Sequence, residues 1–150
     1  MRERENLLLA SYYGGRAFTR AYVGYVHALS HALSAFYNLP HGQTNATVLP
    51  IILRLYGDSV ASDLAELADE AGLSDKEASD AENAAHFIDW IEQMNESMGI
   101  AKYIPEIKEE DLDALTNHAV KEAHQLYPVP IIFTPDEIKH HYLIAKGEVN

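Results

Sequence analysis

Cysteine is absent from the 150 residues, which excludes disulfide bonds and thiolate ligands to a metal. Basic residues are scarce, with 11 Lys and Arg against 23 Asp and Glu, so the formal net charge is -12. Because so acidic a chain repels phosphate backbones and anionic headgroups, we expect neither nucleic acid nor a membrane as a partner. No apolar run approaches the roughly 20 residues of a membrane span, and the first residues lack the apolar core of a secretory leader. These absences predict a soluble, cytoplasmic protein.

Acidic residues are also missing from one long stretch of the chain. No Asp or Glu occurs between Asn6 and Tyr56, where Arg16, Arg20 and Arg54 carry the only formal charges. Ionised groups are costly to bury, so this stretch of about fifty residues is predicted to be buried on most sides. The acidic remainder of the chain is expected to form solvated amphipathic helices around it.

Apolar residues at helical spacing predict an all-α fold, a single domain over residues 1–150 built as a bundle of six or seven helices. Ser74 and Glu77 form a capping-box pattern at one helix start, and Thr134 and Glu137 form another. Pro50 is expected to kink or break its helix. Only the short run 129–133 has the character of a strand. The expected helices cover residues 17–37, 42–55, 59–71, 74–98, 109–126 and 134–146.

Three of the eight histidines, His27, His31 and His41, lie in the acid-free stretch. His27 and His31 are four residues apart on one predicted helix face, where two imidazoles can bind one divalent metal ion. His41 follows the break at Pro40, where the chain can fold back toward that face. The alternative is that the spacing arises by chance and the histidines bind no metal. A core histidine bonded to a carbonyl is commoner than a metal ligand. The remaining histidines are expected to face solvent: His86, His118, His124, His140 and His141.

A metal site built from these histidines alone would be incomplete. A catalytic metal usually takes three protein ligands and an open position, and one ligand is often a carboxylate. No acid lies near the three histidines in the sequence. A complete site would need an acid from the later part of the chain, from another domain or from another chain.

The segment from Gly24 to Pro50 resembles the signature of the iron-containing (group III) alcohol dehydrogenases, and it reads GYVHALSHALSAFYNLPHGQTNATVLP. Three histidines at fixed offsets and the Pro-His-Gly-x-x-Asn-Ala core make this pattern far more specific than a His-x-x-x-His pair. The tail from Leu126 to Pro130, followed by a short final helix, is similar as well. The resemblance covers nearly the whole chain, but only the C-terminal, helical half of such enzymes.

This resemblance implies an NAD(P)-dependent interconversion of small alcohols with aldehydes or ketones, in a cleft between an α/β nucleotide-binding domain and an all-α domain. Iron(II), or sometimes zinc(II), would polarise the substrate oxygen. By the resemblance, His27 and His41 match two of the family's four metal ligands. His31 matches a non-ligand histidine beside the nicotinamide and the substrate that relays a proton, which makes it the expected catalytic and cofactor-binding residue. The resemblance thus makes His27 and His41 the metal-binding pair, whereas the spacing alone favoured His27 and His31.

Four further residues are candidates of lower specificity. Phe18 and Phe36 could line the substrate cavity, although aromatic residues at helical spacing more often belong to a core. Gly42 either lets the backbone pass close to the site or is a plain glycine at a helix start. Asn45 is expected to tie the loop by a side-chain hydrogen bond.

The chain departs from the family in its first residues. The family's other two ligands, an aspartate and a histidine, lie on an upstream helix, and residues 1–26 contain neither residue type. The glycine-rich phosphate-binding turn is also missing. We therefore expect a piece of a longer enzyme, which without its nucleotide-binding domain holds metal weakly and has no dehydrogenase activity.

Two other functions stay open at this point. The chain could be a non-enzymatic helical interaction module, or an independent metal-binding protein whose histidine site is completed by a later acid. An apolar surface left uncovered by the missing domain would favour a homo-oligomer. The sequence does not choose between iron and zinc, between NAD and NADP, or among small alcohol substrates.

Overall fold

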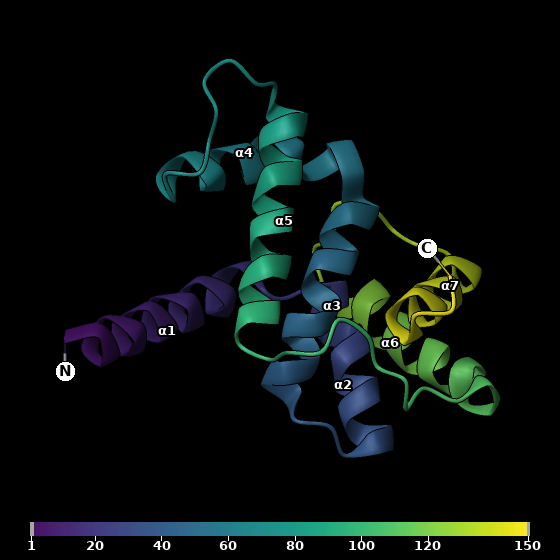
Figure 1. Cartoon of the computed structure of the whole chain (residues 1–150). Coiled ribbons are helices and arrows are strands. Elements are labelled where there is room, and N and C mark those ends of the chain that lie inside the picture. Colours follow the sequence, from purple (N-terminus) through teal and green to yellow (C-terminus); the bar gives the residue numbers. More distant parts are fainter. Residues whose placement is uncertain (1, 150) are drawn as a thin grey trace.

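The computed structural model describes residues 2–149 and holds only helices and loops over that range (Figure 1). The all-α prediction is confirmed, and residues 129–133 form a loop. Within these residues, no helix combines the length and the apolar character that crossing a bilayer requires. The elements are α1 (Arg2–Ala21), α2 (Tyr25–Tyr37), α3 (His41–Tyr56), η1 (Gly57–Val60), α4 (Ala61–Glu70), α5 (Asp80–Ser97), η2 (Glu109–Asp111), α6 (Leu112–Leu126) and α7 (Pro135–Lys146).

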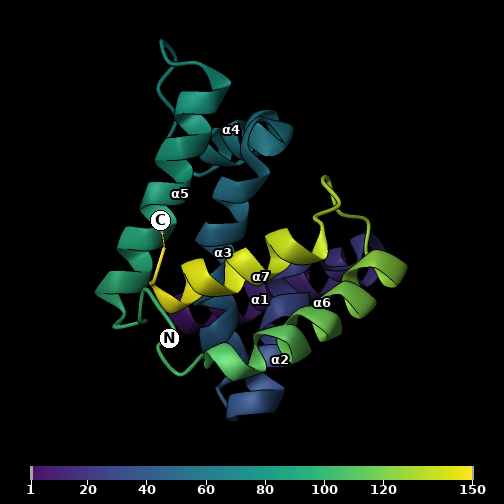
Figure 2. The same ribbon diagram turned by 90° about the vertical axis from the view of Figure 1, so that its right-hand side faces the viewer.

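The main core lies among α2, α3, α6 and α7. Helix α2 packs against both α3 and α6, and α6 and α7 run side by side in opposite directions (Figure 2). Tyr25, Leu29 and Leu33 of α2 are fully buried there, as are Ala119 and Ala123 of α6. Burial of these side chains fixes which face of α2 points inward, and therefore which of its residues reach the surface.

A smaller apolar cluster joins α4 to α5. Leu64, Ala84 and Ile88 are buried in it, and α5 also packs against α3. The guanidinium of Arg54 on α3 lies 2.6 Å from Asp89 and 3.2 Å from Glu92 on α5. These half-exposed ion pairs orient the two helices and contribute little to stability.

Helix α3 continues through Pro50 because α5 supplies the hydrogen bond that this proline removes. Proline has no N–H, so the carbonyl of Ala46, four residues earlier, loses its partner within the helix. The side-chain amide of Asn95 donates to that carbonyl at 2.7 Å. Of the predicted kink or break at Pro50, the break is therefore wrong, and the kink stays a prediction.

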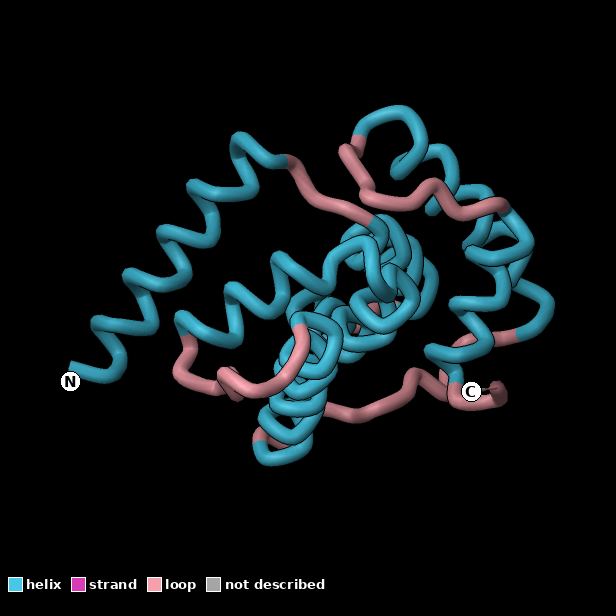
Figure 3. Tube along the Cα trace, turned by 90° about the horizontal axis from the view of Figure 1, so that it is seen from above, coloured by secondary structure: helices cyan, strands magenta, loops and turns pink. Residues whose placement is uncertain are grey.

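The helix expected over residues 17–37 is divided in two. Tyr22 has a positive φ of 62°, and Gly24 has the extended backbone of an N-cap residue, so α1 ends at Ala21 and α2 begins at Tyr25. Helix α1 has no buried residue and lies apart from the other helices (Figure 3). The burial predicted for the acid-free stretch thus holds for α2 and α3 but fails for α1. Its exposed apolar side chains include Leu7, Leu8, Leu9, Tyr12, Tyr13 and Phe18.

One predicted helix start is also displaced. Helix α5 begins at Asp80, where Ser79 and Glu82 form the capping box, and not at Ser74. The hydroxyl of Ser74 donates instead to Asp69 at 2.6 Å. The other predicted capping box is confirmed, since Thr134 accepts from the backbone N–H of Glu137 at the start of α7.

Candidate functional site

The hairpin of α2 and α3 brings the three candidate histidines together. Asn38 ends α2 in a left-handed conformation and Pro40 is the N-cap of α3, so the chain turns back on itself. The ring centroids of His27 and His41 are 5.4 Å apart, and those of His27 and His31 are 5.7 Å apart. The rings of His31 and His41 stack at 4.8 Å. Three imidazoles from two helices therefore form one cluster.

Asn45 marks the point on which two of these rings converge. Its amide nitrogen lies 3.0 Å from Nε2 of His41 and 3.5 Å from Nε2 of His27. Its Oδ1 atom is buried without a hydrogen-bond partner among residues 2–149. In the amide orientation of this structure the N–H₂ group faces both Nε2 atoms, and each of them can accept from it through its lone pair. The expected side-chain tie by Asn45 thus runs to the two predicted metal ligands.

The electrostatics of the cluster favour neutral imidazole at His27. Burial lowers the pKa of His27 below its ordinary value, and the neighbouring His31 and His41 lower it further. Glu122 acts in the opposite direction, but its effect is smaller. Neutral imidazole is the form that binds a metal ion.

The imidazole nitrogens of His27 and His41 are ligand atoms that suit iron or zinc, but two are fewer than such a metal site needs. Imidazole nitrogen suits both iron and zinc, and the lone pairs of His27 and His41 face one point. Within residues 2–149, however, no group of three or more His, Asp or Glu side chains is arranged to hold a metal ion. The two histidines therefore fit as part of a ligand set, and residues 2–149 do not supply a complete one.

Nδ1 of His31 contacts Glu122, a residue that the sequence analysis did not identify. Nδ1 of His31 lies 2.6 Å from Oε1 of Glu122 on α6, and the hydroxyl of Tyr127 donates to the same oxygen. Burial raises the pKa of Tyr127 to about 12, and the hydrogen bond to Glu122 adds to the effect. Glu122 lies 91 residues after His31, and no local motif marks it.

The lower-specificity candidates contribute little to this cluster. Phe18 and Phe36 are 53% and 39% exposed, and Phe36 packs against His118 at 5.7 Å. A side chain added at Gly42 would meet no atom within 4 Å, so nothing in the described residues requires glycine there. The predicted roles of these residues as cavity lining or close backbone approach find no support within residues 2–149.

The prediction that five histidines face solvent is wrong for His141. This residue is 3% exposed, packs edge-on against Phe133 at 4.5 Å, and leaves its Nδ1 atom without a partner among the described residues. Burial lowers the pKa of His141 to about 4. The signal was available in the helical spacing, because Ile138, Tyr142 and Ala145 lie on the same buried face of α7.

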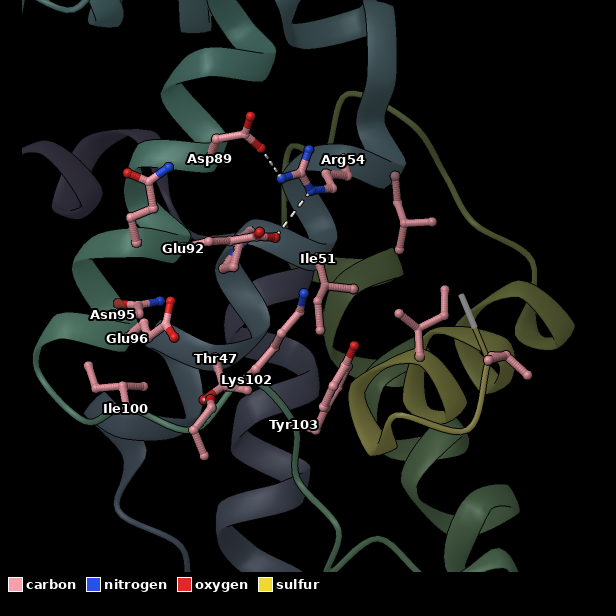
Figure 4. A pocket seen from close by; sticks show the side chains of 16 residues that line it. Thr47, Ile51, Arg54, Asp89, Glu92, Asn95, Glu96, Ile100, Lys102 and Tyr103 are labelled. Carbon is pink, nitrogen blue, oxygen red and sulfur yellow. Dashed lines mark hydrogen bonds and ion pairs between the residues drawn. The ribbon is translucent and has the colours of Figure 1, made fainter.

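A separate cavity of 740 Å³ opens between α3, α5, α7 and the segment 100–103 (Figure 4). Ile51, Ile100 and Tyr103 form apolar parts of its wall, and Arg54 with its two acidic partners lies at one end. None of the three clustered histidines lines it. The histidine cluster and this cavity are thus distinct features of the molecule.

The all-α fold and the two imidazoles that converge from a helical hairpin agree with what the resemblance of the sequence implies. Residues 1–145 match the family described as "Fe-containing alcohol dehydrogenase family, C-terminal". The chain therefore belongs to the iron-containing alcohol dehydrogenase family and corresponds to its C-terminal region.

Individual relatives agree with this assignment. Alcohol dehydrogenase 4 of Saccharomyces cerevisiae is 34% identical over 139 residues, which are 90% of this chain and 35% of the yeast protein. The 1,3-propanediol dehydrogenase of Klebsiella pneumoniae is 34% identical over 131 residues, or 83% of this chain and 33% of that protein. The solved alcohol dehydrogenase of Oenococcus oeni superposes with a TM-score of 0.80 at 31% identity, over 87% of this chain and 34% of that one. The chain thus spans about a third of the length of the relatives it matches.

Proposed function

We propose that this chain is the metal-ligand region of an NAD(P)-dependent dehydrogenase that interconverts small alcohols with aldehydes or ketones. The observation that carries the proposal is the convergence of His27 and His41 on one point, with His31 stacked beside them. The names of the relatives, which include 1,3-propanediol dehydrogenase and lactaldehyde reductase, support substrates of this size.

The positions of the three histidines give them different proposed roles. His27 and His41 would hold iron(II) or zinc(II) through Nε2, and a bound metal would polarise the oxygen of the alcohol or carbonyl substrate. His31 has a 45% exposed side chain beside that point, so it can take a proton from the substrate hydroxyl or return one. Neutral His27, favoured by burial, keeps its lone pair available.

The remaining parts of the reaction centre belong to the rest of the enzyme. Two imidazoles bind a divalent metal more weakly than the three or four ligands of a catalytic site. We therefore propose that the chain alone has no dehydrogenase activity, and that its natural partner is a nucleotide-binding domain supplying the NAD(P) site and further ligands.

Titration of the chain with cobalt(II), a spectroscopic substitute for iron(II) and zinc(II), tests the ligand assignment. His27→Ala and His41→Ala should each lower cobalt affinity by about tenfold or more, which is ~1.4 kcal/mol. His31→Ala should keep most of the affinity, and His118→Ala on α6 serves as the matched control. An equal loss in the His31 variant would overturn the assignment.

A chimaera tests the reaction itself. Residues 1–145 would replace the matching region of the Klebsiella pneumoniae 1,3-propanediol dehydrogenase. The chimaera should oxidise NAD(P)H with a small aldehyde, and His31→Ala within it should lower kcat while metal content stays constant. A metal-loaded, folded chimaera without activity on any small alcohol or aldehyde would contradict the proposed function.

A helical interaction module is the second candidate, and α1 is the observation that favours it. Leu8 and Tyr12 of α1 are 72% and 57% exposed, as expected of a surface that docks on another protein. This function would not depend on the histidines. The triple replacement of His27, His31 and His41 by alanine would leave it intact, whereas the enzymatic function would be lost.

A further inference from the structure

We propose that Glu122 is the positioning residue of His31 and that Tyr127 holds Glu122 in place. The inference rests on the proposed role of His31 as the proton-transferring residue. It adds a carboxylate from α6 to a site otherwise built from α2 and α3.

The contact between Glu122 and His31 is short and partly shielded. Oε1 of Glu122 lies 2.6 Å from Nδ1 of His31, and the Glu122 side chain is only 24% exposed. A carboxylate has no proton to donate, so Nδ1 of His31 carries the hydrogen of this bond. In neutral His31 the lone pair then lies on Nε2. Glu122 thus selects one of two tautomers, in the way that outer-shell carboxylates orient functional histidines.

Tyr127 fixes the carboxylate from the other side. Its hydroxyl donates to Oε1 of Glu122, the same atom that accepts the hydrogen bond from Nδ1 of His31. Tyr127 is the residue at which α6 ends, and its backbone N–H still bonds to Ala123 at 3.1 Å. The end of α6 therefore fixes the position of the Tyr127 phenol, and the phenol in turn fixes the position of the Glu122 carboxylate.

The ring of His31 is also restrained in its plane. It stacks on His41 at 4.8 Å with an angle of 23° between the ring planes, while His27 meets it edge-on. Stacking sets the plane of the ring, and Glu122 sets its rotation within that plane. Together they determine where Nε2 points.

This arrangement assists proton transfer in both directions. A proton that moves from a substrate hydroxyl to Nε2 makes an imidazolium, whose Nδ1–H already donates to the Glu122 carboxylate. The negative charge stabilises the imidazolium, and the hydrogen bond keeps the ring aligned for return of the proton. Glu122 takes up no proton itself and acts only through His31.

Long-range ¹H–¹⁵N spectra of the histidine rings in the 150-residue chain test the inference without metal or activity. In the native chain His31 should be protonated at Nδ1. Glu122→Ala should move it toward the Nε2–H form that predominates in free histidine, Glu122→Asp should restore part of the native signal, and Tyr127→Phe should lie between. Lys121→Ala, an exposed neighbour on α6, is the matched control.

Two further measurements separate this inference from the proposed function. Cobalt(II) affinity of the chain should be nearly the same in Glu122→Ala as in the native chain. In the chimaera the variant should lower kcat by about 10- to 100-fold with little change in KM. Native Nδ1 protonation in Glu122→Ala, a similar tautomer change in Lys121→Ala, or a cobalt loss as large as that of His27→Ala would each overturn the positioning role. An inactive chimaera with the expected tautomer change would count against the proposed function alone.

Discussion

The amide nitrogen of Asn45 lies 3.0 Å from Nε2 of His41, one helical turn earlier on α3. The same nitrogen faces Nε2 of His27 on α2, so a neutral donor stands between the two atoms that we propose as metal ligands. Asparagine and aspartate have the same shape, and a carboxylate is a good ligand for iron and zinc. Position 45 is therefore where one substitution would add the carboxylate that these two histidines lack.

Asn45→Asp should turn the pair of histidines into a two-histidine, one-carboxylate site. We expect the affinity of the chain for zinc(II) or cobalt(II) to rise by about tenfold or more, or ~1.4 kcal/mol. Isothermal titration calorimetry measures the affinity, and the cobalt absorption bands report the coordination. Asn117→Asp on the exposed face of α6 adds the same charge elsewhere. A similar gain in that control would show a general charge effect and sink the prediction.

Asn95 should stabilise the fold through the carbonyl that Pro50 leaves unpaired. Asn95→Ala removes the 2.7 Å bond to the carbonyl of Ala46 and leaves a partly buried acceptor without a partner. We expect a loss of about 1–3 kcal/mol in the free energy of unfolding, measured with urea.

The matched control for this prediction is Pro50→Ala, which restores a backbone N–H within reach of the Ala46 carbonyl. In that background Asn95→Ala should cost clearly less than in the native chain. Equal costs in both backgrounds would show that Asn95 acts through packing and not through the carbonyl.

Features written in short stretches of sequence were predictable. Pro40 ends one helix and begins the next, and Thr134 with Glu137 caps α7, because both effects act within four residues. Ser74 and Ser79 are each followed three residues later by a glutamate, so the motif alone cannot choose between them. The break at Tyr22 has no proline or turn dipeptide to announce it, and only the tertiary structure reveals it.

The same difference between local and distant residues applies to the candidate site. His27, His31 and His41 belong to one local motif, so their meeting in space follows from a single helical hairpin. Glu122 reaches them only because α6 packs on α2, a contact between segments 91 residues apart. Neither composition nor spacing carries that information.

Buried His141 should make the chain less stable in acid. Its pKa is about 4 in the folded chain against an ordinary 6.5, because burial disfavours the charged ring. Between these values the unfolded chain binds a proton at His141 that the folded chain does not, so stability falls as the pH falls from 6.5 to 4. We expect this residue to account for a loss of about 2 kcal/mol over that range.

Urea unfolding at several pH values tests the role of His141. His141→Leu should flatten the decline in stability between pH 6.5 and 4, whatever its effect at neutral pH. His86→Gln, at an exposed histidine on α5, should leave the slope nearly unchanged. The slope is the diagnostic quantity, because a packing defect in the leucine variant would shift the whole curve without changing its tilt.

Helix α1 should make the isolated chain self-associate. Leu8 and Tyr12 lie one turn apart on a helix with no buried residue, and both are mostly exposed. Apolar surface of this kind is stabilised by pairing with a second copy. We expect light scattering to detect a dimer or larger assembly at high concentration, and Leu8→Lys with Tyr12→Lys to convert it to monomer. Ile132→Lys, at a residue 72% exposed in a loop, should not. A native chain that stays monomeric at high concentration would contradict the prediction.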